Sequence, residues 1–268
     1  MTDISEFQNI VWEYYKQNTR SMPWRDNTIE YYVMVSEIML QQTQVNRVLQ
    51  KFPGFIERFP DIDSLACAEL SEVLAEWLGL GYNRRAKFLK QAAEVIAGSY
   101  NGIFPSTVDK WMNLPGFGKN TASAVLVYSR NIPLVFIETN IRTVFIHHFF
   151  PERQSVSDKE IEYYVNKSLD LTNPREWYWA LMDYGTYLKK EFGNVSRKSS
   201  SYSKQSKFEG SFRQKRAAVL RFIVKNKMAT HEEISGKFKL STDILEKVIQ
   251  SLIDDEFIEL RNGTYFVK

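Results

Sequence analysis

The sequence contains few of the side chains that build disulfides and metal centres. Cys67 is its single cysteine, and its three histidines are His147, His148 and His231. A single cysteine excludes an internal disulfide and any metal site built only from cysteines. Neighbouring residues on a helix project about 100° apart, so His147 and His148 cannot share one face. We therefore expect no metal site, no iron–sulfur cluster and no cofactor, and we expect Cys67 to be a small, buried apolar residue.

The sequence also lacks a long apolar run and a strong excess of one charge. A membrane-spanning helix needs about 20 consecutive apolar residues, and neither such a run nor a signal-peptide pattern is present. The formal net charge is +3 over 268 residues, so any affinity for nucleic acid must come from local basic patches. We expect a soluble, cytoplasmic monomer with no membrane partner, associated with the nucleoid if its source is prokaryotic.

Helical periodicity dominates most of the chain. Apolar residues recur at helical spacing through residues 6–194, and glycines and prolines mark the breaks. We therefore predict a mainly α fold with one helical domain over residues 1–194. The pattern predicts helices over 5–17, 32–52, 70–78, 84–99, 108–113, 121–129, 140–148, 158–169 and 176–190.

The last part of the chain has a different pattern. Helical spacing resumes after residue 211, and Thr230 with Glu233 forms a capping box at the start of a second helix. A third helix follows, and an Asn262-Gly263 turn then joins two short strands. Three helices and a β-hairpin predict a winged-helix domain over residues 211–268. The third helix carries many acidic residues, so DNA contact, protein contact and a structural role all remain open.

A glycine-rich hairpin is expected at residues 114–119, which read Leu-Pro-Gly-Phe-Gly-Lys. The free backbone N–H groups at the start of the following helix suit a phosphate, and Lys119 adds a positive charge beside them. An ordinary connection between helices is the alternative interpretation. The pattern favours a helix-hairpin-helix clamp on a nucleic-acid backbone, with contacts from Leu114, Gly116, Gly118, Lys119 and Thr121.

Residues 195–210 form a polar, basic segment without helical or strand periodicity. The centre of the segment reads Ser-Arg-Lys-Ser-Ser-Ser-Tyr-Ser-Lys-Gln-Ser-Lys. This composition is typical of a flexible linker, and its cations also suit a DNA backbone. We interpret the segment as a basic linker or a DNA-contacting loop, with Arg197 and Lys198 as candidate phosphate contacts.

Two acidic residues lie in apolar stretches of the sequence. Glu37 occurs within Val35-Ser-Glu-Ile-Met-Leu40, and Glu138 follows four apolar residues at the start of an expected helix. Apolar surroundings raise the pKa of a carboxyl group, which would suit Glu37 as a general acid. Each residue alone also has a structural interpretation, which for Glu138 is helix capping. Together with a DNA clamp, two carboxylates with different pKa values suggest cleavage of a glycosidic bond in DNA.

Five short motifs carry a family resemblance. They are Met22-Pro-Trp-Arg25, Ser36-Glu-Ile-Met-Leu-Gln-Gln-Thr-Gln44, Gly79-Leu-Gly-Tyr82, Leu114-Pro-Gly-Phe-Gly-Lys119 and Met182-Asp-Tyr-Gly185. In order and spacing, residues 8–190 resemble the adenine DNA glycosylases of the MutY type, within the helix-hairpin-helix DNA glycosylase superfamily. The resemblance implies a two-lobed fold, with a six-helix lobe at about 22–130 and a second lobe from residues 1–21 and 131–194.

The resemblance also implies roles for individual residues. It identifies Glu37 with the acid that protonates the flipped adenine, and Glu138 with the aspartate that stabilises the sugar cation. Gln42 and Tyr82 correspond to residues that wedge into the duplex, and Arg25 corresponds to a residue of the base pocket. Flipping a base costs a few kcal/mol, which wedging and stacking would offset.

Several positions depart from the family pattern. The family's Asp-Gly-Asn is Glu138-Thr-Asn140 here, which moves the carboxylate by about one bond length. Asn120 stands where relatives have Tyr, Ser or a Schiff-base Lys, and Trp179 stands where they read adenine with Gln or Glu. Residues 188–202 lack the four-cysteine iron–sulfur cluster of most members, and the winged-helix domain replaces their 8-oxoguanine-sensing domain.

These observations lead us to expect a monofunctional DNA N-glycosylase of base excision repair. Its expected partner is double-stranded DNA with a mismatched or damaged pair, and its first expected substrate is adenine opposite 8-oxoguanine or guanine. Without a lysine at position 120, covalent lyase chemistry is not expected. Trp179 donates one hydrogen bond and accepts none, so uracil or thymine opposite guanine is an alternative. The departure at Glu138 leaves a lesion-binding protein without catalytic activity as a second alternative.

Overall fold

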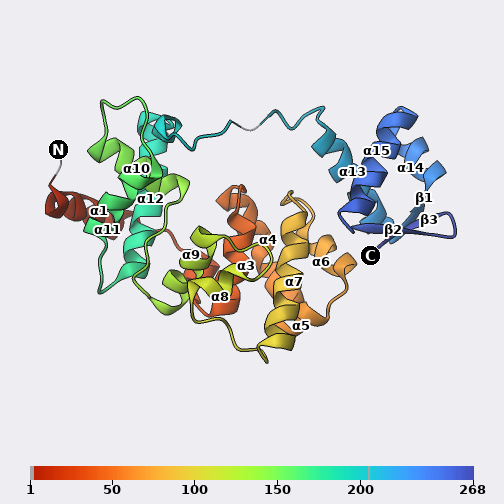
Figure 1. Cartoon of the computed structure of the whole chain (residues 1–268), viewed down its shortest axis with the longest axis horizontal. Coiled ribbons are helices and arrows are strands. Elements are labelled where there is room, and N and C mark those ends of the chain that lie inside the picture. Colours follow the sequence, from red (N-terminus) through yellow and green to blue (C-terminus); the bar gives the residue numbers. More distant parts are fainter. Residues whose placement is uncertain (1–2, 205) are drawn as a thin grey trace. The chain divides into compact units, whose positions relative to one another are not determined.

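The computed structural model describes residues 3–204 and 206–268, and most of them are helical (Figure 1). These residues form two compact units. The first unit comprises the described residues up to Glu37, Pro105–Asn113 and Phe117–Lys204, and the second comprises Ile38–Phe104, Leu114–Gly116 and the described residues from 206 onward. The boundaries of these units differ from those of the two lobes that the resemblance implies.

The first unit consists of helices and one short 3₁₀ helix. None of the helices in the described ranges is long and apolar enough to cross a membrane. The elements of this unit are α1 (Ile4–Asn18), α2 (Pro23–Asp26), α3 (Glu30–Leu40, which continues into the second unit), α8 (Val108–Met112), α9 (Lys119–Arg130), α10 (Thr139–Phe149), α11 (Asp158–Ser168), α12 (Pro174–Phe192) and η1 (Val195–Lys198).

Aromatic side chains from α1, α10 and α12 form the core of the first unit. The centroid of the Phe7 ring lies 5.1 Å from that of Phe145, 5.0 Å from that of Phe149 and 6.0 Å from that of Trp177. All four side chains are buried. Tilted and edge-to-face aromatic pairs add roughly 0.5–1.5 kcal/mol beyond the burial of their area. This cluster therefore places α12 firmly against α1 and α10.

The second unit combines four helices with the C-terminal domain. Phe55 packs against Phe59 and Trp77, with ring centroids 5.0 Å and 6.1 Å apart, and all three side chains are buried. Its elements are α4 (Val45–Arg58), α5 (Ile62–Cys67), α6 (Leu70–Trp77), α7 (Arg84–Ser99), α13 (Phe212–Asn226), β1 (Met228–Thr230), α14 (His231–Phe238), α15 (Thr242–Asp254), β2 (Ile258–Arg261) and β3 (Thr264–Val267).

The chain bends where the sequence pattern predicts one helix over 32–52. That prediction is wrong, because α3 and α4 are separate helices and Gln42 between them has a left-handed φ of 54°. The buried Arg85 guanidinium donates to the main-chain oxygens of Ile38, Met39 and Gln41. These carbonyls would otherwise bond to the next turn of a continuing helix. A side chain from α7 therefore ends α3. The spacing of apolar residues within α3 and α4 does not indicate this interruption, because it depends on a residue of another helix.

The predicted winged-helix domain is confirmed as three helices and an antiparallel sheet. The sheet has the order β1-β3-β2, with Tyr265 of β3 opposite both Ala229 and Leu260. Asn262 and Gly263 have φ values of 49° and 78°, as a tight hairpin turn requires. The sequence pattern does not predict β1, because a strand of three residues is too short to show alternation.

The expected linker 195–210 is only partly a connection. Val195–Lys198 form η1, which packs on α10, and the Val156 main chain bonds on both sides to Lys198 and Ser200. The segment up to Lys204 therefore belongs to the first unit. Cys67 is exposed, contrary to expectation, because it is the last residue of the short helix α5.

Candidate active site

The two candidate carboxylates, Glu37 and Glu138, both lie in the first unit. Glu37 is on α3, and only 8% of it is exposed. Glu138 is half-buried and is the N-cap residue of α10, with an extended backbone. The partial positive charge of a helix N-terminus favours an ionised carboxylate at the Glu138 position.

The environments of these carboxylates differ. Burial raises the pKa of Glu37 well above its ordinary value, the charge of Glu138 raises it further, and Arg25 opposes both effects. Burial also raises the pKa of Glu138, but the positive charges of Arg142 and Lys189 act against that change. The pKa of Glu138 is still raised overall, but the two cations make Glu138 the more readily ionised group of the pair and Glu37 the more readily protonated one. Such a pair can give a proton to a leaving group and face a developing cation.

Tyr128 on α9 is a buried group near both carboxylates. Burial raises the pKa of its phenol well above the ordinary value, and the charges of Glu138 and Glu37 raise it further. The hydroxyl is therefore neutral and can both donate and accept a hydrogen bond. Tyr128 is not among the site residues predicted from the sequence, because a tyrosine on the apolar face of a helix has the same spacing as any core residue.

Trp179 on α12 is half-buried and lies between two other groups of the site. Its ring is stacked with that of Tyr128, with centroids 6.2 Å apart and an interplanar angle of 15°. The guanidinium carbon of Arg25 lies 5.4 Å from the Trp179 ring centroid, within the range of a cation–π interaction. The first unit thus brings together four of the expected site residues, Glu37, Glu138, Arg25 and Trp179, and adds Tyr128.

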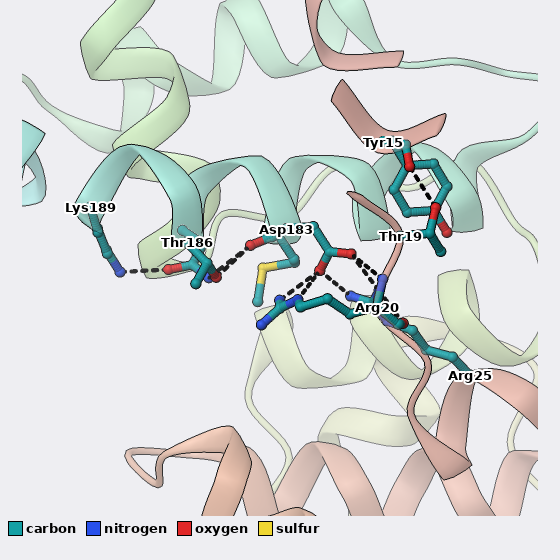
Figure 2. A network of polar contacts seen from close by, with 9 residues as sticks. Tyr15, Thr19, Arg20, Arg25, Asp183, Thr186 and Lys189 are labelled. Carbon is teal, nitrogen blue, oxygen red and sulfur yellow. Dashed lines mark hydrogen bonds and ion pairs between the residues drawn. The ribbon is translucent and has the colours of Figure 1, made fainter. Parts of the chain in front are cut away.

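Arg25 is positioned by Asp183, as Figure 2 shows. Its Nη1 lies 2.8 Å from Asp183 Oδ2 and its Nη2 lies 2.9 Å from Oδ1. Arg20 also donates to this carboxylate, with its Nε 2.7 Å from Oδ1. The Asp183 and Arg25 side chains are 1% and 7% exposed. A two-pronged, buried ion pair of this kind orients the guanidinium as well as neutralising it.

A second set of contacts sets the start of α10, directly after Glu138. The Asn140 amide nitrogen donates to the Met182 carbonyl and to Thr186 Oγ1, both at 3.0 Å, and the Asn140 amide oxygen accepts from Lys189 at 2.5 Å. Figure 2 shows Asp183, Thr186 and Lys189 along one helix, α12.

Gly185 permits the main chain of α12 to lie close to the first turn of α10. A Cβ atom at Gly185 would lie 2.5 Å from the Asn140 main-chain oxygen, so no other residue fits. The motif Met182-Asp-Tyr-Gly185 therefore has two structural tasks. Asp183 orients Arg25, and Gly185 lets α12 pack against the first turn of α10, beside Glu138.

Asn120 lies in the exposed first turn of α9. Its amide nitrogen donates to the Ile137 main-chain oxygen at 3.0 Å. Asn120 thus contacts the residue directly before Glu138. At this position the chain has a neutral amide that orients backbone and no amine that could attack a sugar.

The glycine hairpin leads into the N-terminus of α9. Gly118 is the N-cap residue and Lys119 the first helical residue, and both are exposed. The first turn of α9 contains no acidic residue, so the helix dipole and Lys119 both favour an anion there. Gly116 has a φ of 87°, which glycine adopts readily. Leu114 is buried and Thr121 is half-buried.

The wedge candidates Gln42 and Tyr82 lie in the second unit. Both are exposed and left-handed, with φ values of 54° and 49°. Arg85 connects their loops: its guanidinium is 5.5 Å from the Tyr82 ring centroid and bonds to Thr43 Oγ1 at 2.9 Å and to the Gly81 oxygen at 3.1 Å. Burial lowers the pKa of Arg85 to about 10. Arg85 is not among the site residues predicted from the sequence, since charged residues of amphipathic helices are mostly exposed.

The basic segment after α12 places its two candidate phosphate contacts differently. Arg197 is exposed, whereas the half-buried Lys198 donates to the Pro151 main-chain oxygen at 2.6 Å. Lys198 therefore helps to attach the segment to the end of α10, and Arg197 is the freer cation for a phosphate.

The residues at the end of α12 and in the segment after it do not fit an iron–sulfur cluster. Leu188 to Tyr202 supply no thiolate, and η1 packs directly on α10. Among residues 3–204 and 206–268, no group of three or more His, Cys, Asp and Glu side chains is arranged to hold a metal ion.

Curated proteins similar to this chain include adenine DNA glycosylases. That of Buchnera aphidicola subsp. Baizongia pistaciae is 34% identical over 192 residues, which cover 70% of this chain and 54% of the relative. That of Mycolicibacterium smegmatis is 40% identical over 142 residues, covering 53% of this chain and 48% of the relative. The chain thus spans about half the length of these relatives.

Solved structures show the same fold. A thermostable thymine-DNA glycosylase matches with a TM-score of 0.60 and 21% identity, over 68% of this chain and 85% of that one. A trapped endonuclease III–DNA covalent intermediate matches with a TM-score of 0.56 and 19% identity, over 70% of this chain and 88% of that one. The family model described as HhH-GPD superfamily base excision DNA repair protein matches residues 35–170. This chain belongs to the HhH-GPD superfamily.

Proposed function

We propose that this chain is a DNA N-glycosylase that removes a base flipped out of the duplex. The observation that carries the proposal is the pair of carboxylates in the first unit. Burial raises the pKa of both carboxyl groups; the charge of Glu138 adds to the rise at Glu37, whereas Arg142 and Lys189 oppose the rise at Glu138. Family membership and the adenine DNA glycosylases among the relatives support the same activity.

The proposed reaction uses each carboxyl group once. Glu37 gives its proton to the leaving base, the bond between the base nitrogen and the sugar C1′ breaks, and the electron pair leaves with the base. The Glu138 carboxylate stabilises the positive charge on the sugar. Water then adds to C1′ and loses a proton, which leaves an abasic site.

Adenine opposite 8-oxoguanine or guanine is the first proposed substrate, because the curated relatives are named adenine DNA glycosylases. Trp179 favours a second candidate, uracil or thymine opposite guanine. Its indole can stack on any base but offers one donor and no acceptor, so it cannot form an amide-like pair with adenine. The proposed pocket thus selects by stacking more than by hydrogen bonding.

We further propose that the enzyme has no lyase activity. Asn120 bonds to the Ile137 oxygen and has no amine to form a Schiff base with the sugar. The proposed DNA contacts are the wedges Gln42 and Tyr82, Arg197 of η1, and the hairpin with the N-terminus of α9.

Base release from labelled duplexes tests the proposal. Duplexes with A·8-oxoG, A·G, U·G and T·G pairs are treated with the wild type, Glu37→Gln and Glu138→Asp, and cleavage is measured with and without alkali. Glu162→Gln, at an exposed position on α11 of the same unit, is the matched control. Adenine release that needs Glu37, with strand cleavage only after alkali, is the expected result.

Other outcomes each exclude part of the proposal. Release only from U·G or T·G would replace adenine by a pyrimidine as the substrate. Strand cleavage without alkali would contradict the absence of lyase activity. Tight binding without release from any duplex would show a lesion-binding protein, and Glu138→Asp would then test whether the extra methylene is the cause.

A further inference from the structure

The winged-helix domain is attached to the N-terminal end of α7 within the second unit. The Asp255 carboxylate, directly after α15, binds both Arg84 and Arg216, with Arg84 Nε 3.1 Å from its Oδ2. Lys87 Nζ lies 2.9 Å from the Asp255 main-chain oxygen and 2.6 Å from Glu256 Oε2. In addition, α13 packs on α6. These contacts set the position of α13 relative to the loop before α7.

The third helix of the domain, α15, is a poor DNA-binding element. Its exposed charged side chains are three acids and one lysine, namely Asp243, Glu246, Asp254 and Lys247. Three carboxylates facing a phosphate backbone would repel it. In addition, Asp255 at the end of α15 is bound to α7 and α13. The helix that enters the major groove in helix-turn-helix proteins is therefore unsuited to that role here.

The start of α13 has the opposite character. Residues 206–230 contain seven Lys and Arg residues and one acid, Glu209. Arg213, in the first turn of α13, donates to the Ser206 main-chain oxygen at 2.8 Å and to Ser206 Oγ at 3.1 Å. Its other terminal nitrogen, Nη1, lies 3.4 Å from the Tyr82 hydroxyl. Arg213 is thereby directed toward the exposed Tyr82 ring.

Basic side chains flank the Tyr82 loop from two sides. Lys51 of α4 lies against the other end of the loop, with its Cε 3.6 Å from the position of a Cβ at Gly79. Arg213 approaches Tyr82 itself. An arginine has five donors, and its fork matches the geometry of a phosphate. A duplex that reaches Tyr82 would bring its backbone within reach of Arg213.

We propose that Arg213 binds a DNA phosphate beside the Tyr82 wedge, so that the start of α13 extends the DNA-binding surface of the second unit. This inference rests on the proposed function, because that function places Tyr82 at the DNA. The contact is to backbone and not to a base. It therefore raises affinity for every duplex equally and leaves the choice of opposite base unchanged.

Duplex binding measured by fluorescence anisotropy over a range of salt concentrations tests the proposal on the full chain. Arg213→Gln is expected to weaken binding about fivefold or more, equally for matched and mismatched duplexes, and to reduce the salt slope by about one. Arg213→Lys, which keeps the charge, is expected to retain most of the affinity. Lys247→Gln, at an exposed cation on α15, is the matched control and is expected to leave affinity unchanged.

Two results would overturn the proposal. Either Arg213→Gln binds like the wild type at low salt, or it loses affinity for one opposite base only, which would make Arg213 a base reader. A thermal melt of each variant shows whether it is folded. Base release at saturating protein separates this inference from the proposed function. If no duplex loses a base while Arg213→Gln still weakens binding, the proposed glycosylase activity is wrong and the proposed contact between Arg213 and DNA is supported.

Discussion

The Arg25 guanidinium and the Asp183 carboxylate form a buried, two-pronged ion pair that joins α2 to α12. Its two N–O distances are 2.8 Å and 2.9 Å. We expect Asp183→Asn to leave Arg25 buried without a matching charge, at a cost of about 3–5 kcal/mol in unfolding free energy. Chemical denaturation measures this loss. A variant as stable as the wild type would show that this ion pair adds nothing to stability.

Glu37→Gln should stabilise the protein at neutral pH. The folded-state pKa of Glu37 lies above its unfolded value, so the folded state binds more protons and its stability falls as pH rises from the unfolded pKa toward the folded one. The amide removes this loss and the repulsion from Glu138. Each 1 kcal/mol gained raises the melting temperature by roughly 2–4 °C.

Melting temperatures at about pH 5 and about pH 8 check this expectation. The wild type should lose more stability than Glu37→Gln between the two, and Glu162→Gln should behave as the wild type. Equal pH dependence of all three proteins would mean that Glu37 is ionised without cost and is not a proton donor.

Tyr128→Phe separates the hydroxyl of Tyr128 from its ring. The ring stacks on Trp179 and should keep the fold, while the lost hydroxyl removes the neutral polar group near Glu37 and Glu138. We expect base release to fall about tenfold, or 1.4 kcal/mol in the barrier, with little change in melting temperature. Single-turnover kinetics measure the effect. An unchanged rate would show that the Tyr128 hydroxyl has no role in base release and that Tyr128 contributes only packing.

Arg85→Met should destabilise the second unit. The substitution leaves the carbonyl oxygens at the end of α3 without their donor, at an expected cost of about 3–5 kcal/mol. Hydrogen exchange of α3 and α7 locates the loss. Arg84→Met is the control, because its side chain is 62% exposed and its ion pair with Asp255 should contribute at most about 1 kcal/mol.

Local patterns in the sequence determined most of the helices. The helix over 84–99 has the predicted bounds, and the Thr230–Glu233 capping box and the Asn262-Gly263 turn are where the sequence places them. Each of these depends on contacts between residues close in the chain. The motifs between Met22 and Gly185 indicate the superfamily by their residues, order and spacing, which are also properties of the sequence alone.

Tertiary structure alone decided what depends on distant partners. The end of α3 depends on Arg85 from α7, and the orientation of Arg25 depends on Asp183 from α12. The association of Tyr128 with both carboxylates, and of Arg213 with Tyr82, also joins segments far apart in sequence. Periodicity records which face of a helix is buried, but it does not record which side chain from another helix will meet that face.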